Sequence, residues 1–134
     1  MAMADISTIQ QSHYEAFMDS DNLTELASQW WRIIAPYADR CFARMLIVTD
    51  MQHIDDQIGF VRELYETVEY IAELPCPIPL TTARRQMLNA LDTMIASYQL
   101  AITGDPERAL QENHSAIGQL MRVRATLSGF DVEV

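Results

Sequence analysis

The chain has 134 residues, of which 49% are hydrophobic, so it is long enough and apolar enough to form one domain with its own core. Nine arginines, with no lysine, face nineteen carboxylates, and the resulting net charge of −10 disfavours direct binding to nucleic acid, because phosphate backbones are bound by basic surfaces. The apolar runs are too short to cross a bilayer and no leader pattern is present, so we expect a cytoplasmic protein that does not bind membranes. The two cysteines fit that reducing compartment.

Two helices are expected before residue 50. An apolar stripe predicts a short helix over 7–18, and a polar turn at 19–22 follows it. The second helix carries two adjacent stripes, so its apolar face is wider than a surface helix usually shows. These stripes are Leu23, Leu26, Trp30, Ile33, Tyr37 and Cys41, and beside them Ala27, Trp31, Ile34 and Ala38. Pro36 is expected to kink this helix rather than divide it, because the apolar phase continues past it to Val48.

A third helix is expected from about Asp50 to Leu74, after a capping-box pattern that begins at Thr49. Its expected inward positions are Ile54, Ile58, Val61, Leu64 or Tyr65, Val68, Ile71 and Leu74. Seven carboxylates against one arginine give residues 50–74 a charge of −6. The acidic face expected on the opposite side includes Asp55, Asp56, Glu63 and Glu66.

Three prolines predict an extended connector over 75–80, since each proline also restricts the residue before it. A fourth helix is expected to begin at Thr81 or Thr82. The segment 103–106 then combines a helix-ending glycine, a capping aspartate and a proline suited to a first helical position, which predicts a fifth helix to about Ser128. So short a link makes these two helices antiparallel.

The fold prediction is therefore all-α. It is a single domain over 1–134, an antiparallel helical bundle of four to five helices that ends in a long αα-hairpin. Residues 131–134 are expected to form a flexible tail.

Four arginines are expected to gather at one end of this bundle. They come from the two arms of the hairpin and are Arg84, Arg85, Arg122 and Arg124. The first two oppose the dipole of the fourth helix, and folding about Gly104 brings residue 85 opposite about residue 124. The cluster either pairs internally with Glu69 and Glu73 or forms a docking site for an anionic group or for the acidic face of a second copy.

Trp30 and Trp31 form the second candidate site. They lie about 100° apart around a helix, so one neighbouring helix cannot easily cover both. With Ile34, they belong either to a central helix enclosed by the others or to an interface with a subunit or partner, where tryptophan and arginine are enriched.

The sequence contains no recognisable catalytic or metal-binding motif. It lacks a phosphate-binding glycine loop, a nucleophile elbow and the Glu-x-x-His pairs that helical di-iron sites use. We therefore expect no enzymatic activity, no metal and no cofactor, and a function in binding another protein or a second copy of the same chain. Two alternatives stay open. One is an acidic decoy whose third helix occupies a basic groove of a nucleic-acid-binding protein, and the other is a small-ligand pocket lined by methionines and by Tyr37, Tyr65 and Tyr98.

Overall fold

The computed structural model describes residues 20–45 and 47–134, so the helix expected over 7–18 lies outside the described residues. The described part of the chain is all-helical, with four α-helices and no strand. These helices are α2 (Ser20–Ala43), α3 (Ile54–Glu73), α4 (Thr81–Ile102) and α5 (Pro106–Ser128). Short 3₁₀ turns, Met51–His53 and Ile78–Leu80, lead into α3 and α4. None of the described helices has a stretch long and apolar enough to span a bilayer.

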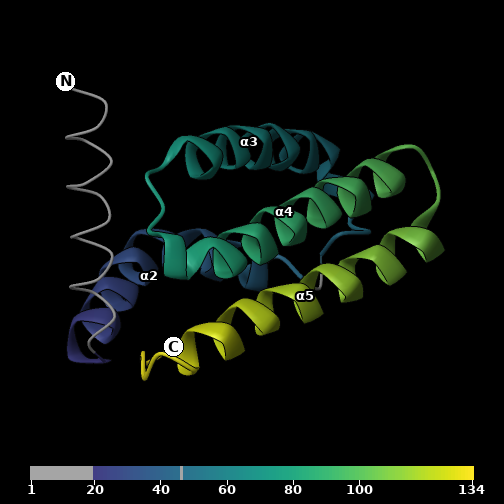
Figure 1. The fold of residues 1–134 in the computed structure, drawn as a ribbon. Coiled ribbons are helices and arrows are strands. Elements are labelled where there is room, and N and C mark those ends of the chain that lie inside the picture. The colour runs from purple at the N-terminus through teal and green to yellow at the C-terminus, as the bar shows by residue number, and fades with distance from the viewer. Residues whose placement is uncertain (1–19, 46) are drawn as a thin grey trace.

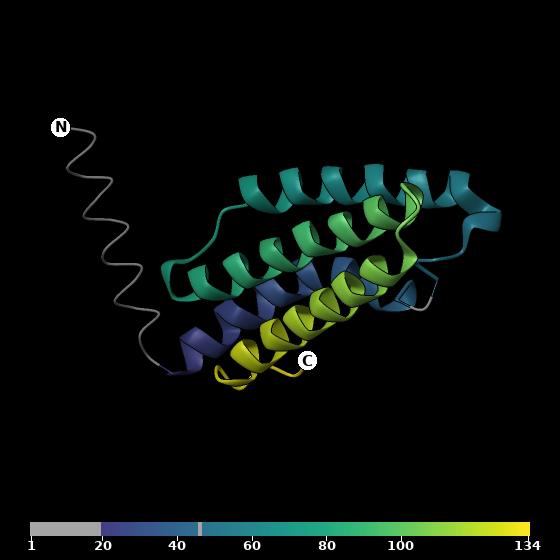
Figure 2. The ribbon, with the colours of Figure 1, turned by 90° about the vertical axis from the view of Figure 1, so that its right-hand side faces the viewer.

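Successive helices run in opposite directions, as Figures 1 and 2 show. α3, α4 and α5 lie side by side in chain order, and α2 lies behind α4 and α5 in Figure 1. α4 and α5 make the most extensive contact between helices. The side-chain hydrogen bonds that join them include Thr126 Oγ1 donating to Gln86 Oε1 at 2.7 Å and Gln119 Nε2 donating to Thr93 Oγ1 at 3.1 Å. α3 lies at one end of this row, so one of its sides faces solvent.

α2 continues through Pro36 as one helix of 24 residues, so the chain is not divided there. Pro36 is exposed, and the backbone hydrogen bond that it removes therefore lies on the solvent side, where water can satisfy the freed carbonyl. The helix ends at Ala43, before the apolar pattern ends at Val48. Its buried positions combine members of both expected stripes: Ala27, Trp30, Trp31, Ile34, Ala38 and Cys41.

The predicted inward face of α3 is confirmed in part, because Leu64 and Ile71 are buried, and Val61 and Val68 pack against the core. The expectation that Ile54 and Ile58 face inward is wrong, because their side chains are 40% and 43% exposed. The buried positions are Gln57, Phe60, Leu64, Thr67 and Ile71. Because a periodicity argument counts Gln57 as polar, it assigns Ile58 to the inward face instead, one position later and about 100° further around the helix.

Gln57 can be buried because both ends of its amide are hydrogen-bonded. Its Nε2 donates to the carbonyl oxygen of Ile47, and its Oε1 accepts from Nη2 of Arg44. A buried polar side chain costs little free energy when its hydrogen bonds are made within the protein. The Gln57 side chain thereby connects the start of α3 to the loop that follows α2.

The Arg44 guanidinium lies against two aromatic rings of the core. Its Cζ is 4.3 Å from the centroid of Phe60 and 5.6 Å from that of Tyr98. The two rings meet edge to face at 4.9 Å, and the Tyr98 hydroxyl donates to the Arg44 carbonyl oxygen at 2.9 Å. Burial raises the pKa of Tyr98, which keeps this hydroxyl protonated and able to donate. We call Arg44, Gln57, Phe60 and Tyr98 the Arg44 cluster, since it joins the end of α2 to α3 and α4.

The chain beyond α5 folds back onto the helices. Asp131 has a φ of 60°, and the N–H of Val132 donates to the carbonyl oxygen of Leu127 at 3.4 Å. The Val132 side chain is buried in the core. The expectation of a flexible tail over 131–134 therefore does not hold at Val132.

Three glycines provide a test of the helix boundaries. Gly104, in the α4–α5 link, has a φ of +93°, so alanine there is expected to lower the free energy of unfolding by about 1–2 kcal/mol. Gly59 and Gly118 lie within helices and have open space around an added Cβ, so alanine there is expected to raise the free energy of unfolding by ~1 kcal/mol. Urea unfolding followed by circular dichroism compares the three single variants, and changes of the same sign in all three would contradict the assignment.

Candidate functional site

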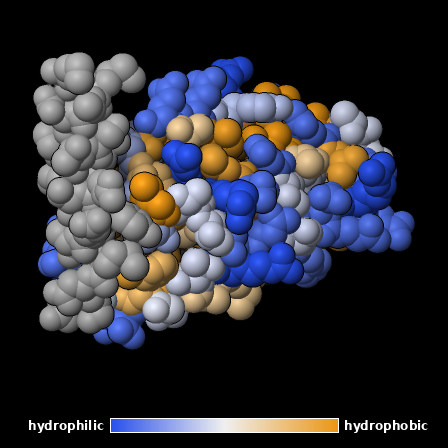
Figure 3. Space-filling model, in the orientation of Figure 1, coloured by the Kyte–Doolittle hydropathy of each residue, from blue (hydrophilic) through white to orange (hydrophobic). Residues whose placement is uncertain are grey.

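The outer side of α3 carries an apolar stripe on the surface. Ile54, Ile58, Val61 and Tyr65 follow one another at spacings of four, three and four, which places them on one face of the helix over about 16 Å. Tyr65 is 50% exposed, and Val61 is partly buried. We call these four residues the α3 apolar stripe. In Figure 3 apolar side chains appear among polar ones in the upper part of the molecule, over α3 and α4.

A shallow depression of about 330 Å³ lies along this stripe. Its floor and walls come from one helix, and the residues that line it are Ile58, Val61, Arg62, Tyr65, Glu66 and Glu69. Apolar atoms and charged groups are thus presented together, as in the core and rim of a protein interface.

The position of the Tyr65 ring is set by a hydrogen bond from α4. Gln99 Nε2 donates to the Tyr65 hydroxyl oxygen at 2.9 Å. A side chain that is already held in place loses less conformational entropy when a partner binds to it. Tyr65 therefore presents an aromatic ring, with its hydroxyl already hydrogen-bonded, at one end of the α3 apolar stripe.

The predicted acidic residues of α3 lie in two different environments. Asp55, Asp56 and Glu66 are exposed to solvent. Glu63 instead faces α2, where its Oε2 is 3.3 Å from Nε of Arg40. α3 contains six carboxylates and one arginine, so this helix carries a charge of −5.

The register between α4 and α5 differs from the one on which the predicted cluster of four arginines is based. The hydrogen bonds Thr93–Gln119 and Gln86–Thr126 place residue 85 level with about residue 127, roughly one helical turn from the expected position. The reason is that the length of the link alone does not determine how the two helices slide along each other.

The two arginines of α5 project in different directions. Arg124 faces α2, where Nη2 is 3.4 Å from Oδ1 of Asp39 and Cζ is 4.3 Å from the centroid of Phe42. Arg122 lines a groove between α4 and α5. Within the described residues, Arg84 and Arg85 form no ion pair, with Glu69 and Glu73 or with any other carboxylate.

The tryptophan face of α2 is core in this structure. Trp30 and Trp31 are 4% and 7% exposed, and Ile34 is fully buried. The face is therefore covered within the chain itself and does not offer a free surface to a partner.

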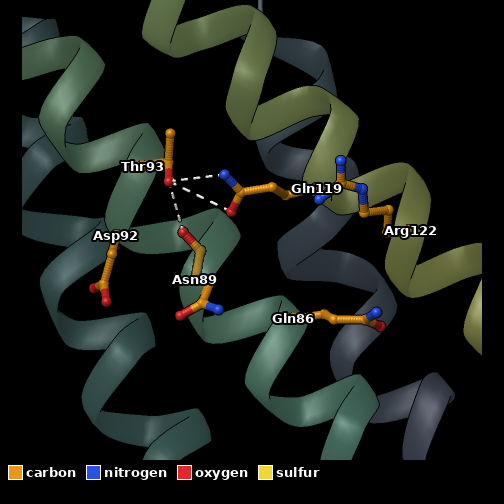
Figure 4. A pocket seen from close by; sticks show the side chains of 6 residues that line it. All are labelled: Gln86, Asn89, Asp92, Thr93, Gln119 and Arg122. Atoms are coloured by element: carbon orange, nitrogen blue, oxygen red, sulfur yellow. Dashed lines mark hydrogen bonds between the residues drawn. The ribbon is translucent and has the colours of Figure 1, made fainter.

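A polar groove of about 420 Å³ lies between α4 and α5 (Figure 4). It is lined by Gln86, Asn89, Asp92 and Thr93 of α4 and by Gln119 and Arg122 of α5. Gln86, Thr93 and Gln119 already form hydrogen bonds between the helices. The lining has no apolar side chain to exclude water, so this groove is a weaker candidate than the α3 surface. The sequence carries no signal for it, because polar residues at helical spacing are typical of any solvated face.

The remaining polar groups offer no constellation for metal binding. In residues 20–45 and 47–134, no three histidine, cysteine or carboxylate side chains gather at one point. His53 Nδ1 and Asp50 Oδ2 are 2.9 Å apart at the exposed 3₁₀ turn before α3. Their hydrogen bond raises the pKa of His53 and lowers the pKa of Asp50.

Comparison with known proteins adds no family. No protein-family model matches the chain, and no match was found among curated proteins or solved structures. The functional argument therefore depends on the geometry described above.

Both cysteine thiols have raised pKa values. Burial raises the pKa of Cys41 to about 12, and the charge of Glu63 acts in the same direction. Partial burial also raises the pKa of Cys76, although Arg84 partly offsets this effect. A raised pKa leaves little thiolate at neutral pH, and the thiolate is the nucleophile.

Alkylation of the folded protein is therefore expected to modify Cys76 before Cys41, with Cys41 reacting only after urea is added. The pKa of Cys41 is higher in the folded state than its ordinary value of 9.0. The protonated thiol therefore adds to the free energy of unfolding below pH 9, and this contribution is lost as the pH rises toward 12. Intact-mass measurement of iodoacetamide labelling in the Cys76→Ser variant is the check. Labelling of that folded variant at the rate of a free thiol would contradict the buried placement of Cys41.

Proposed function

We propose that the chain is a cytoplasmic antiparallel helical bundle ending in an αα-hairpin, and that it works as a non-enzymatic protein-interaction module. Its docking surface is the outer side of α3, centred on the α3 apolar stripe. The observation that carries the proposal is the exposure of Ile54, Ile58 and Tyr65 on one face of one helix. Exposed apolar residues that are contiguous and rimmed by polar groups are typical of interaction sites.

The composition of this surface favours binding over chemistry. It presents branched aliphatic side chains, one tyrosine ring and several carboxylates on a regular helix. Aromatic and aliphatic anchors surrounded by charge are what a protein interface needs. The hydroxyl of Tyr65, the one hydroxyl on the stripe, is already hydrogen-bonded to Gln99.

A small-ligand pocket has less support. The methionines and tyrosines considered for such a pocket do not share one cavity, because Met87, Met94 and Tyr98 are fully buried in the core and Tyr65 lies on the surface. Side chains that fill a close-packed core leave no room for a ligand.

Self-association through the α2 tryptophans also has less support than the binding of a different protein. Trp30 and Trp31 are buried within one chain, so a dimer built on them would need the chain to open first. Two copies that met through α3 would bring two helices of charge −5 together, and like charges in an interface are repulsive.

Position-specific crosslinking tests the docking surface. With a photo-reactive phenylalanine analogue at position 58, we expect a covalent adduct to another protein in the cell that makes this chain. The same analogue at position 121 is the matched control, because Met121 on α5 is 59% exposed and Ile58 is 43% exposed.

The adduct from position 58 is expected to disappear when Tyr65→Ser is also present, since one partner covers both positions. Equal adducts from positions 58 and 121, or an adduct that Tyr65→Ser leaves unchanged, would count against the α3 surface. An adduct between two copies of this chain would assign the surface to self-association instead.

A further inference from the structure

We infer that the occupant of the α3 surface is a basic amphipathic helix of a partner protein. Its apolar side chains would lie on the α3 apolar stripe, and its lysines or arginines would face the carboxylates beside it. This inference rests on the proposed function and adds the chemical class of the partner.

The charge of α3 is the first observation behind this inference. Five of its six carboxylates form no ion pair with a described residue, and these are Asp55, Asp56, Glu66, Glu69 and Glu73. Among the described residues, Glu63 alone of these carboxylates forms an ion pair, with Arg40. Arg62 is the single base of the helix, so an occupant lying along α3 meets a surplus of negative charge along most of its length.

This charge excludes several other occupants. Nucleic acid and a membrane of anionic lipids are both repelled by such a surface. A second copy of the chain would present carboxylates to carboxylates. A partner with lysine or arginine beside its apolar residues is complementary, and complementary charge both speeds encounter and selects the partner.

The shape of the surface is the second observation. The stripe extends over about 16 Å on a single straight helix face, which corresponds to three turns of a helix lying alongside it. A partner helix with apolar residues at i, i+4, i+7 and i+11 would match the stripe's own spacing. The depression between Ile58 and Tyr65 can receive one large apolar side chain of that helix.

Arg62 adds a condition on the partner's sequence. It lines the depression beside Val61, between the two exposed apolar residues Ile58 and Tyr65. A basic side chain opposite Arg62 would be repelled, so the partner is expected to carry an apolar or acidic residue there. Its basic residues belong opposite Asp55 at one end and Glu66 and Glu69 at the other.

Fluorescence anisotropy with synthetic peptides tests the inference on the full chain. The probe is a labelled 18-residue amphipathic helix of leucine and lysine. Its controls are the same helix with glutamate in place of lysine, and a scrambled leucine and lysine peptide without an apolar stripe. We expect the first to bind, the glutamate peptide to show no binding, and the scrambled peptide to bind at least about ten-fold more weakly. Binding of the first peptide is expected to weaken as salt is raised, because part of the attraction is between exposed charges.

Two double variants on α3, each with a matched control double variant elsewhere, distinguish loss of the docking surface from general effects on the protein. Ile58→Ser with Tyr65→Ser is expected to raise Kd at least ten-fold, whereas Leu110→Ser with Met121→Ser, at comparably exposed positions of α5, leaves it unchanged. Glu66→Arg with Glu69→Arg is expected to abolish binding, whereas Glu112→Arg with Glu133→Arg, which makes the same change in net charge, leaves most of it. Circular dichroism confirms that each variant is folded.

The outcomes that overturn the inference are distinct from those that overturn the proposed function. Equal binding of the lysine and glutamate peptides, or equal losses in the α3 and control variants, would refute a basic helix as the occupant. A dimer of the chain alone that dissociates in the Ile58→Ser, Tyr65→Ser variant would assign the surface to a second copy. A crosslink from position 58 without peptide binding would leave the proposed docking surface in place and remove only the partner class.

Discussion

The packing of Arg44 onto Phe60 and Tyr98 is the contact on which the rest of this structure depends. It places a guanidinium over two rings, closes a hydrogen bond from the Tyr98 hydroxyl, and supplies the donor that lets Gln57 be buried. These contacts join the residue after α2 to both α3 and α4, so the cluster influences how α3 is rotated about its own axis. That rotation decides which apolar residues of α3 enter the core and which reach solvent. The surface proposed for partner binding is therefore a consequence of a polar contact in the interior.

For the described residues, the sequence predicts the helices and their antiparallel directions well, but the rotation of α3 and the register of α5 poorly. The capping aspartate, proline and glycine around residue 105 lie where local signals place them, because caps depend on neighbours within one turn. The inward face of α3 was misjudged because Gln57 is buried only through Arg44 and Ile47, ten or more residues away in the chain. The register assumed between Arg85 and Arg124 was misjudged, because the register between α4 and α5 depends on side-chain contacts between the two helices. Helix caps and turns can be predicted from one sequence, whereas the rotation and register of the helices depend on contacts between distant segments.

The net charge alone does not show which charged side chains are paired within the chain and which face solvent. Several arginines are engaged within the chain: Arg40 pairs with Glu63, Arg124 contacts Asp39 and Phe42, and Arg44 lies on aromatic rings. Arginine suits these positions because its planar group can stack on a ring and pair with a carboxylate. The carboxylates left without such contacts include most of those on α3. The net charge of −10 is thus distributed unevenly, because α3 alone carries −5.

The placement of the aromatic residues separates the two tryptophans from the proposed docking surface. Both tryptophans lie on α2 inside the core, whereas Tyr65 stands half-exposed at the end of the α3 apolar stripe, with its hydroxyl held by Gln99. Tryptophan emission therefore reports on the integrity of the interior and responds when the fold opens. The tyrosine signal, by contrast, includes a ring in contact with solvent at the surface where a partner would arrive. Unfolding of the domain is accordingly expected to change tryptophan emission more than occupancy of the α3 surface does.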